Sequence, residues 1–83
     1  MNQYADKRKD YFRSMVAMNV RAMRRHLGLT QTELAEKVGV SKHTILRLEK
    51  ELFSPSFQDV IMICEVLGVE PSEIYKPLDI DYD

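Results

Sequence analysis

Apolar side chains recur along this chain at intervals of three and four residues, and strand signals are absent. This period predicts amphipathic helices that turn their apolar faces to one core. Five helices are expected, the first from about Lys9 to His26. The expected core residues are Phe12, Val16, Val20, Met23 and Leu27 on the first helix, Phe57, Val60, Ile63, Cys64 and Leu67 on the fourth, and Ile74 on the fifth.

Short polar residues, glycine and proline mark where these helices begin and end. Gly28 ends the first helix, and Thr30 followed by Glu33 predicts a capping box at the start of the second. Ser56 is a suitable N-cap for the fourth helix, and Pro71 fits the first turn of the fifth. The chain is therefore expected to be all-α, with short connections.

Residues 31–50 predict two short helices that meet at a sharp angle. Leu34 and Val38 give the first of them an apolar face, and Ala35 beside them allows close approach of the second. Gly39 suits the left-handed backbone that ends a helix, and Ser41 can cap the next helix after a turn of about three residues. This is the spacing of a helix-turn-helix, which makes sequence-specific DNA binding the leading interpretation.

The second helix of this pair carries residue types that contact DNA. Ile45 and Leu48 form its apolar side, which leaves polar and basic residues on other faces. The planar guanidinium of Arg47 can donate two hydrogen bonds to guanine, so Arg47 is the best candidate for a base contact. A solvated helix face is the alternative. The expected DNA-binding residues are Gln31, Ser41, Lys42, His43, Thr44, Arg47 and Lys50.

These residues resemble the lambda-repressor-like helix-turn-helix family, also called the Cro/CI or XRE family. The resemblance runs from about Val16 to Tyr75 and includes the motifs GLTQ, LA, VGVS and a later LGV. It implies a compact five-helix domain whose helix-turn-helix is formed by helices 2 and 3. It also implies that Gln31 meets a backbone phosphate, and that Arg24 and Glu49 pair to tie helix 1 to the end of helix 3.

The sequence departs from the family directly after the third helix. Glu51 stands where relatives usually have glycine, and left-handed backbone at a glutamate would cost about 1 kcal/mol. The helix is therefore expected to end differently or to run on. Leu52 and Phe53 replace residues that often touch the DNA backbone, and they either fold under the fourth helix or join a partner surface. Fewer phosphate contacts are expected from this loop.

Charge is distributed unevenly although the net charge is only −1. Residues 1–50 hold 11 Lys and Arg against 5 acids, whereas residues 51–83 hold 1 against 8. This asymmetry predicts that one pole faces phosphate. Three segments are expected: a basic N-terminal arm or helix extension at 1–14, a DNA-binding domain at 15–76 and an acidic tail at 77–83. The basic run Lys7–Lys9 either reaches DNA or is solvated.

Signals for catalysis, metal binding and membranes are weak. His26, His43 and Cys64 do not have the spacing of a zinc site, and no glycine-rich phosphate loop or carboxylate pair is present. Neither an enzyme nor a cofactor is expected. One cysteine and the lack of a signal-like apolar run predict a reducing cytoplasm, and the apolar run from Val60 to Cys64 is too short to span a bilayer.

Apolar residues outside the expected core keep a second function open. They either cover neighbouring loops or form a contact, most simply a homodimer. The leading hypothesis is a transcriptional regulator, a repressor, that reads an inverted-repeat operator in double-stranded DNA as a homodimer. The alternative is an antitoxin or antirepressor that holds a partner protein. The surplus residues are Tyr11, Met15 and Met18 on the first helix and Ile61, Met62 and Val66 on the fourth.

Overall fold

The computed structural model describes the backbone of residues 3–77 and the side chains of residues 10–77. Within this range the chain forms five helices and no strand, which confirms the predicted all-α class. The side chains of the basic run at 7–9 and nearly all of the acidic tail lie outside the described residues. The helices are α1 (Gln3–His26), α2 (Gln31–Val38), α3 (Lys42–Glu49), α4 (Phe57–Leu67) and α5 (Pro71–Ile74).

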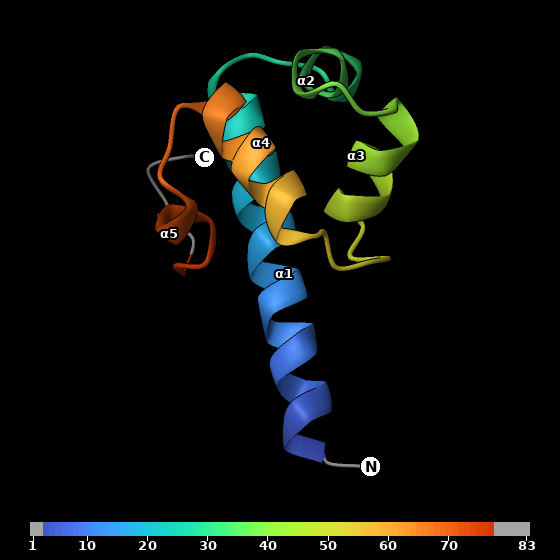
Figure 1. Cartoon of the computed structure of the whole chain (residues 1–83), viewed down its shortest axis with the longest axis vertical. Coiled ribbons are helices and arrows are strands. Elements are labelled where there is room, and N and C mark those ends of the chain that lie inside the picture. The colour runs from blue at the N-terminus through green and yellow to red at the C-terminus, as the bar shows by residue number, and fades with distance from the viewer. Residues whose placement is uncertain (1–2, 78–83) are drawn as a thin grey trace.

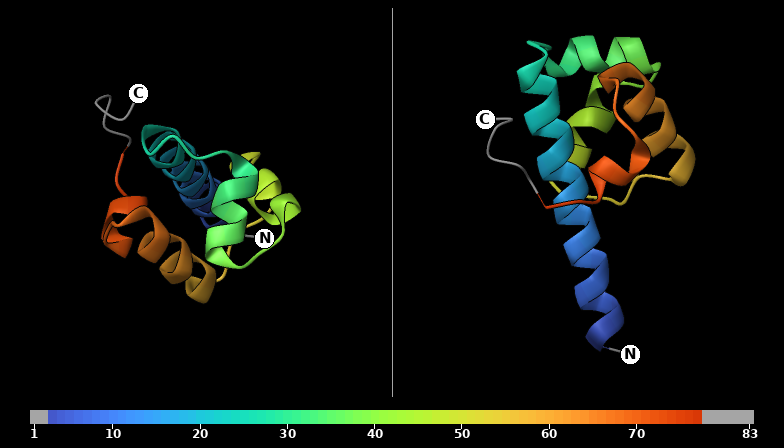
Figure 2. Two further views of the ribbon diagram at one scale, coloured as in Figure 1. Left: turned by 90° about the horizontal axis from the view of Figure 1, so that it is seen from above. Right: turned by 90° about the vertical axis from the view of Figure 1, so that its left-hand side faces the viewer.

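The long helix α1 is the central element of the fold. In Figure 1, α3 and α5 lie on opposite sides of α1, and Figure 2 shows its N-terminal half extending beyond the other helices. α1 begins at Gln3 instead of near Lys9, because residues 3–9 contain no glycine or proline and include several good helix formers. No helix among the described residues has both the length and the apolar character required to cross a membrane.

The buried face of α1 is wider than the predicted stripe. Val16, Val20 and Met23 are buried as expected, at most 3% exposed. A second buried row lies one residue earlier along the helix, because α1 has neighbours on two sides. The amide of Asn19 in this row donates to the backbone carbonyls of Ile74 and Lys76, both at 2.8 Å. The second row consists of Met15, Asn19 and Ala22.

The core prediction is wrong for three residues. Phe12 and Leu27 are each 49% exposed and Phe57 is 72% exposed. Phe12 lies on the part of α1 that approaches the protruding end, where its ring meets Tyr75 edge to face at 6.0 Å between centroids. Leu27 follows the last helical residue of α1, and Phe57 is the first residue of α4. Side chains at such ends have fewer neighbouring helices to cover them.

The remaining core agrees with the predicted helical faces. It takes residues from α1, α2, α3, α4 and α5, and Ile74 of α5 is fully buried. Met62 and Val66, two of the surplus apolar residues, pack against this core, and Met15 is buried within the chain. Tyr11 and Met18 stay exposed on the outer side of α1. The other helices contribute Leu34, Ala35, Val38, Ile45, Leu48, Val60, Ile63, Cys64 and Leu67.

The predicted capping box at the start of α2 is confirmed. The Glu33 backbone N–H donates to the Thr30 hydroxyl at 3.0 Å, and the Thr30 backbone N–H donates to the Glu33 carboxylate at 2.9 Å. The backbone and hydroxyl hydrogen bonds from Thr30 lower the pKa of Glu33 below its ordinary value. Ser56 caps α4 and Pro71 begins α5, also as predicted.

Candidate nucleic-acid interface

The helix-turn-helix has the geometry that its sequence predicts. α2 ends at Gly39, whose φ of 90° is left-handed, and three residues separate the last residue of α2 from the first of α3. Leu34 and Ala35 of α2 are buried together with Ile45 of α3, so the two helices share one core. The small side chain of Ala35 is 2% exposed, in agreement with its expected place at the contact.

The outward face of α3 carries a basic row, made of His43, Arg47 and Lys50. Intervals of four and three residues place these side chains on one side of the helix, and all three are exposed. Lys42, the first residue of α3, is exposed beside the row. Ile45 is buried on the opposite side, and α3 lies at the edge of the molecule in Figure 1. The row is therefore accessible to a large partner.

Ser41 and Thr44, two more of the predicted DNA-binding residues, begin α3. The Thr44 backbone N–H donates to the Ser41 hydroxyl at 3.1 Å, which satisfies one of the free donors of the first turn. The two hydroxyl oxygens lie 3.0 Å apart and share a hydrogen bond. Ser41 is exposed and Thr44 is half-buried. Both residues therefore fix the start of the basic row, whatever further contacts they make.

A buried ion pair holds the inner side of α3. The Nε and Nη2 atoms of Arg24 donate to the Glu49 carboxylate at 2.7 and 2.9 Å, and Nη1 donates to the Leu29 carbonyl at 2.8 Å. Arg24 is 8% exposed and Glu49 is 7% exposed. The pairing that the family resemblance implied is thus confirmed. It joins the last turn of α1 to the last residue of α3, so the inner side of α3 is fixed.

Gln31, at the start of α2, joins the same network. Its Nε2 atom donates to Glu49 Oε1 at 3.2 Å, and the side chain is half-buried. A side-chain amide nitrogen has two N–H groups, so Gln31 can donate a second hydrogen bond outward. The network accounts fully for its buried polar atoms, because no described buried side-chain nitrogen or oxygen lacks a partner.

The loop after α3 makes the left-handed turn expected to be costly at a glutamate. Glu51 has a φ of 62°, and the Leu52 backbone N–H donates to the Arg47 carbonyl at 2.9 Å. The expectation that the helix would end differently or run on is therefore wrong, because it ends through a left-handed turn at Glu51 itself. Of the two alternatives for Leu52 and Phe53, Phe53 takes the first and packs against the core, whereas Leu52 is 60% exposed, which excludes the core and leaves the partner surface.

This turn also creates a contact that sequence reasoning missed. The Arg47 guanidinium carbon lies over the Phe53 ring, 5.5 Å from its centroid. The one available signal was the departure from the family pattern, an aromatic residue where basic or polar residues are common. Nothing in the periodicity indicated that Phe53 would meet Arg47.

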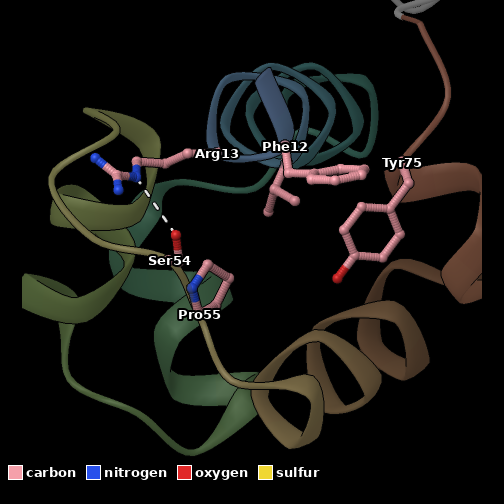
Figure 3. Close-up of a pocket in the computed structure, with 6 residues that line it drawn as sticks. Phe12, Arg13, Ser54, Pro55 and Tyr75 are labelled. Atoms are coloured by element: carbon pink, nitrogen blue, oxygen red, sulfur yellow. Dashed lines mark hydrogen bonds between the residues drawn. The ribbon is translucent and has the colours of Figure 1, made fainter. Parts of the chain in front are cut away.

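A small cavity lies between α1 and the loop that joins α3 to α4 (Figure 3). Its volume is about 90 Å³, well below the roughly 300 to 1,000 Å³ of most small-molecule sites. Arg13 donates from Nε to the Ser54 hydroxyl at 3.4 Å at its rim. Burial, followed by the nearby Cys64, raises the pKa of Tyr75, so its hydroxyl stays protonated at neutral pH. The other lining residues are Phe12, Val16 and Pro55.

Reactive and metal-binding groups are not gathered into a site in the described part of the chain. No three described His, Cys, Asp or Glu side chains are grouped so that they could hold a metal ion. Cys64 is a free, buried cysteine. Burial raises its pKa, with further contributions from Glu73 and Glu70, which keeps the thiol protonated. The basic row of α3 is therefore the main candidate site.

Comparison of the sequence with known proteins gives a family and several relatives. The profile of a helix-turn-helix family matches residues 20–74. An uncharacterized HTH-type transcriptional regulator of Methanothermobacter thermautotrophicus is 48% identical over 62 residues, which are 75% of this chain and 90% of that protein. The immunity repressor protein of Bacillus phage phi105 is 30% identical over 59 residues, which are 71% of this chain and 41% of the repressor.

Solved structures show the same arrangement of helices. A hypothetical transcription factor, NHTF from Neisseria, has a TM-score of 0.79 at 23% identity, over 83% of this chain and 78% of that chain. The clp gene regulator ClgR from Corynebacterium glutamicum has a TM-score of 0.72 at 27% identity, over 76% of this chain and 67% of that chain. Together with the turn geometry and the matched residues, these likenesses show that the chain belongs to the Cro/CI-type (XRE) helix-turn-helix family of transcriptional regulators.

Proposed function

We propose that this chain is a repressor that binds an inverted-repeat operator as a homodimer, with α3 of each copy in the major groove. The observation that carries the proposal is the exposed row of His43, Arg47 and Lys50 on a helix whose inner side is fixed by buried contacts. A rigid helix with basic side chains on its outer face suits recognition of base edges between two phosphate backbones.

Each predicted contact residue has a role that its position supports. Arg47 donates its two-pronged hydrogen bond to guanine, because this exposed residue lies in the middle of the row. Lys42, His43 and Lys50 share base and phosphate contacts on either side of it. Ser41 and Thr44 place the first turn of α3 against the DNA backbone.

Gln31 is proposed to contact a phosphate of the DNA backbone. The amide of Gln31 is already oriented by Glu49, and its second N–H is available for a phosphate oxygen. The start of α2 also carries the partial positive charge of a helix N-terminus. Gln31 and Glu49 would thereby connect the bound phosphate to the C-terminal end of α3.

The proposed homodimer follows from the small size of α3, the helix proposed to contact the bases. One copy offers a single eight-residue α3, whereas two copies related by a twofold axis place two such helices about 34 Å apart in successive major grooves. Such symmetry in the protein requires symmetry in the operator. Tyr11 and Met18 on the outer side of α1 and Leu52 beyond α3 are exposed apolar residues available for the contact between copies.

Repression is the regulatory outcome that one relative supports. The phage relative is named an immunity repressor, and it shares 30% identity with this chain over 59 residues. A DNA-binding domain can repress by occupying its operator, which requires no additional surface. Activation would require a contact with the transcription machinery.

Selection of duplexes from a randomised pool tests the proposal directly. The chain should enrich a two-part inverted repeat, bind it with an affinity that falls steeply as salt increases, and have the mass of a dimer in the complex. A reporter behind the selected duplex should lose expression when the chain is present. Failure to enrich any sequence, together with a stable complex with a partner protein, would favour the antitoxin or antirepressor alternative.

A further inference from the structure

We infer that Phe53 is a positioning residue for Arg47, and that the specificity of the proposed DNA contact depends on the face of its ring. The inference rests on the proposed function, because it assigns Arg47 a partner within the protein that prepares it for base recognition. The guanidinium carbon lies 5.5 Å from the centroid of the ring. This is within the distance of about 6 Å at which a cation is attracted to an aromatic face.

The two residues differ in how firmly the protein holds them. Phe53 is half-buried and packs against the hydrophobic core, whereas Arg47 is exposed on the outer face of α3. A long exposed arginine samples many rotamers, and a base contact would have to select one of them. The anchored ring reduces that freedom before DNA arrives, so less conformational entropy is lost on binding.

Contact with the ring leaves the chemistry of base recognition available. A phenyl ring has no oxygen or nitrogen acceptor, so it does not take up the N–H donors of the guanidinium as a carboxylate would. The two parallel donors that recognise guanine are therefore not used by Phe53. An acidic partner in the place of Phe53 would occupy these donors and compete with the base.

The left-handed turn after α3 brings the ring to Arg47. Glu51, with φ of 62°, reverses the chain, and the Leu52 backbone N–H bonds to the carbonyl of Arg47 itself. Phe53 follows directly, so the segment that ends α3 also folds back beside the central residue of the basic row. The loop thus contributes an aromatic support at a place where members of the family often have residues that touch the DNA backbone.

The first test measures the stack without DNA. In the free protein, the side-chain protons of Arg47 should show ring-current shifts in their NMR spectrum, and Phe53→Leu should abolish these shifts. Leucine keeps an apolar side chain in the core but has no π face. Phe53→Tyr should keep the shifts. Unchanged Arg47 shifts in Phe53→Leu would overturn the inference whatever the DNA result.

The second test measures binding to the duplex that the wild-type chain enriches from a randomised pool. Phe53→Leu should weaken binding about two- to fivefold, the size of an exposed cation–π contact, and should reduce the preference for guanine at the position read by Arg47. Phe53→Tyr should restore both. Phe57→Leu is the matched control, because Phe57 is a nearby aromatic residue that is 72% exposed, and it should bind like wild type.

A double-mutant cycle separates positioning from a general effect on the fold. In an Arg47→Ala background, Phe53→Leu should cause no additional loss of affinity, and unfolding midpoints would show that each variant is folded. An equal loss with and without Arg47 would overturn the inference, as would tighter binding by Phe53→Leu. If the wild-type chain enriches no duplex, the proposed function itself fails. If the wild type binds its duplex and Phe53→Leu binds equally well, only the inference about Phe53 fails.

Discussion

Arg24 and Glu49 form a two-pronged ion pair that joins α1 to the last residue of α3, with donor–acceptor distances of 2.7 and 2.9 Å. The pair is buried, and the Leu29 carbonyl and the Gln31 amide complete its hydrogen bonds. A buried pair of this kind does little for net stability compared with apolar residues, but it leaves a stranded charge when one partner is removed. Its value here is geometric, because it fixes the end of the helix that carries the basic row.

Arg24→Ala should destabilise the chain by about 3 kcal/mol, because the Glu49 carboxylate would stay buried without a cation. The measurement is the free energy of unfolding from urea titrations. Arg24→Met combined with Glu49→Leu should lose less than either single variant, since no charge is then stranded. A midpoint that stays at the wild-type value in Arg24→Ala would show that the pair does not contribute to folding.

Arg47→Ala should weaken binding to the selected operator by about 1 to 3 kcal/mol and relax the base preference at one position in each half-site. The fold should be unaffected, because Arg47 is exposed. Competition assays with duplexes altered at single positions measure both effects. A loss of affinity that is equal for all sequences would mean that Arg47 touches only phosphate.

Glu51→Gly should stabilise the chain by about 1 kcal/mol, because Glu51 has a left-handed φ of 62° and glycine adopts this conformation without the steric penalty of a Cβ atom. Thermal unfolding would detect the gain as a higher Tm. Glu51→Ala is the control, since alanine removes the charge but keeps the Cβ atom. An equal rise in Tm for both variants would assign the effect to charge.

Asn19→Ala should cost roughly 2 to 4 kcal/mol, because Asn19 is buried and its amide donates to the carbonyls of Ile74 and Lys76. These carbonyls would lose their donor, and the connection between α1 and α5 would weaken. Hydrogen exchange of the backbone amides of α5 should become faster, in addition to the lower global stability. Met18→Ala, at the exposed neighbouring position, should change neither quantity appreciably.

The stability of Glu33→Gln should fall less in acid than the stability of the wild type. The folded-state pKa of Glu33 is lowered by its hydrogen bonds from Thr30, so the carboxylate contributes stability above its unfolded pKa. That contribution is lost as the pH falls through the lowered folded-state value. Urea midpoints at pH 7 and pH 3 should therefore differ less in Glu33→Gln, and an equal difference in both proteins would contradict the assignment.

The sequence by itself determined the local features of this protein. The capping box at Thr30, the left-handed end at Gly39 and the N-cap at Ser41 each depend on backbone groups within about four residues, so their spacing in the chain is sufficient to predict them. The helical period identified Val20 as core for the same reason. The outer face of α3 followed from the positions of its apolar residues.

Only the tertiary structure decided which faces other helices cover and which distant side chains meet. Phe12 and Phe57 satisfy the helical period but lie where few neighbours reach them, whereas Asn19 is polar and yet buried because α5 supplies acceptors for its amide. The ring of Phe53 meets Arg47 because the backbone reverses at Glu51. Such contacts depend on the paths of several segments at once, and no periodic pattern along the chain encodes them.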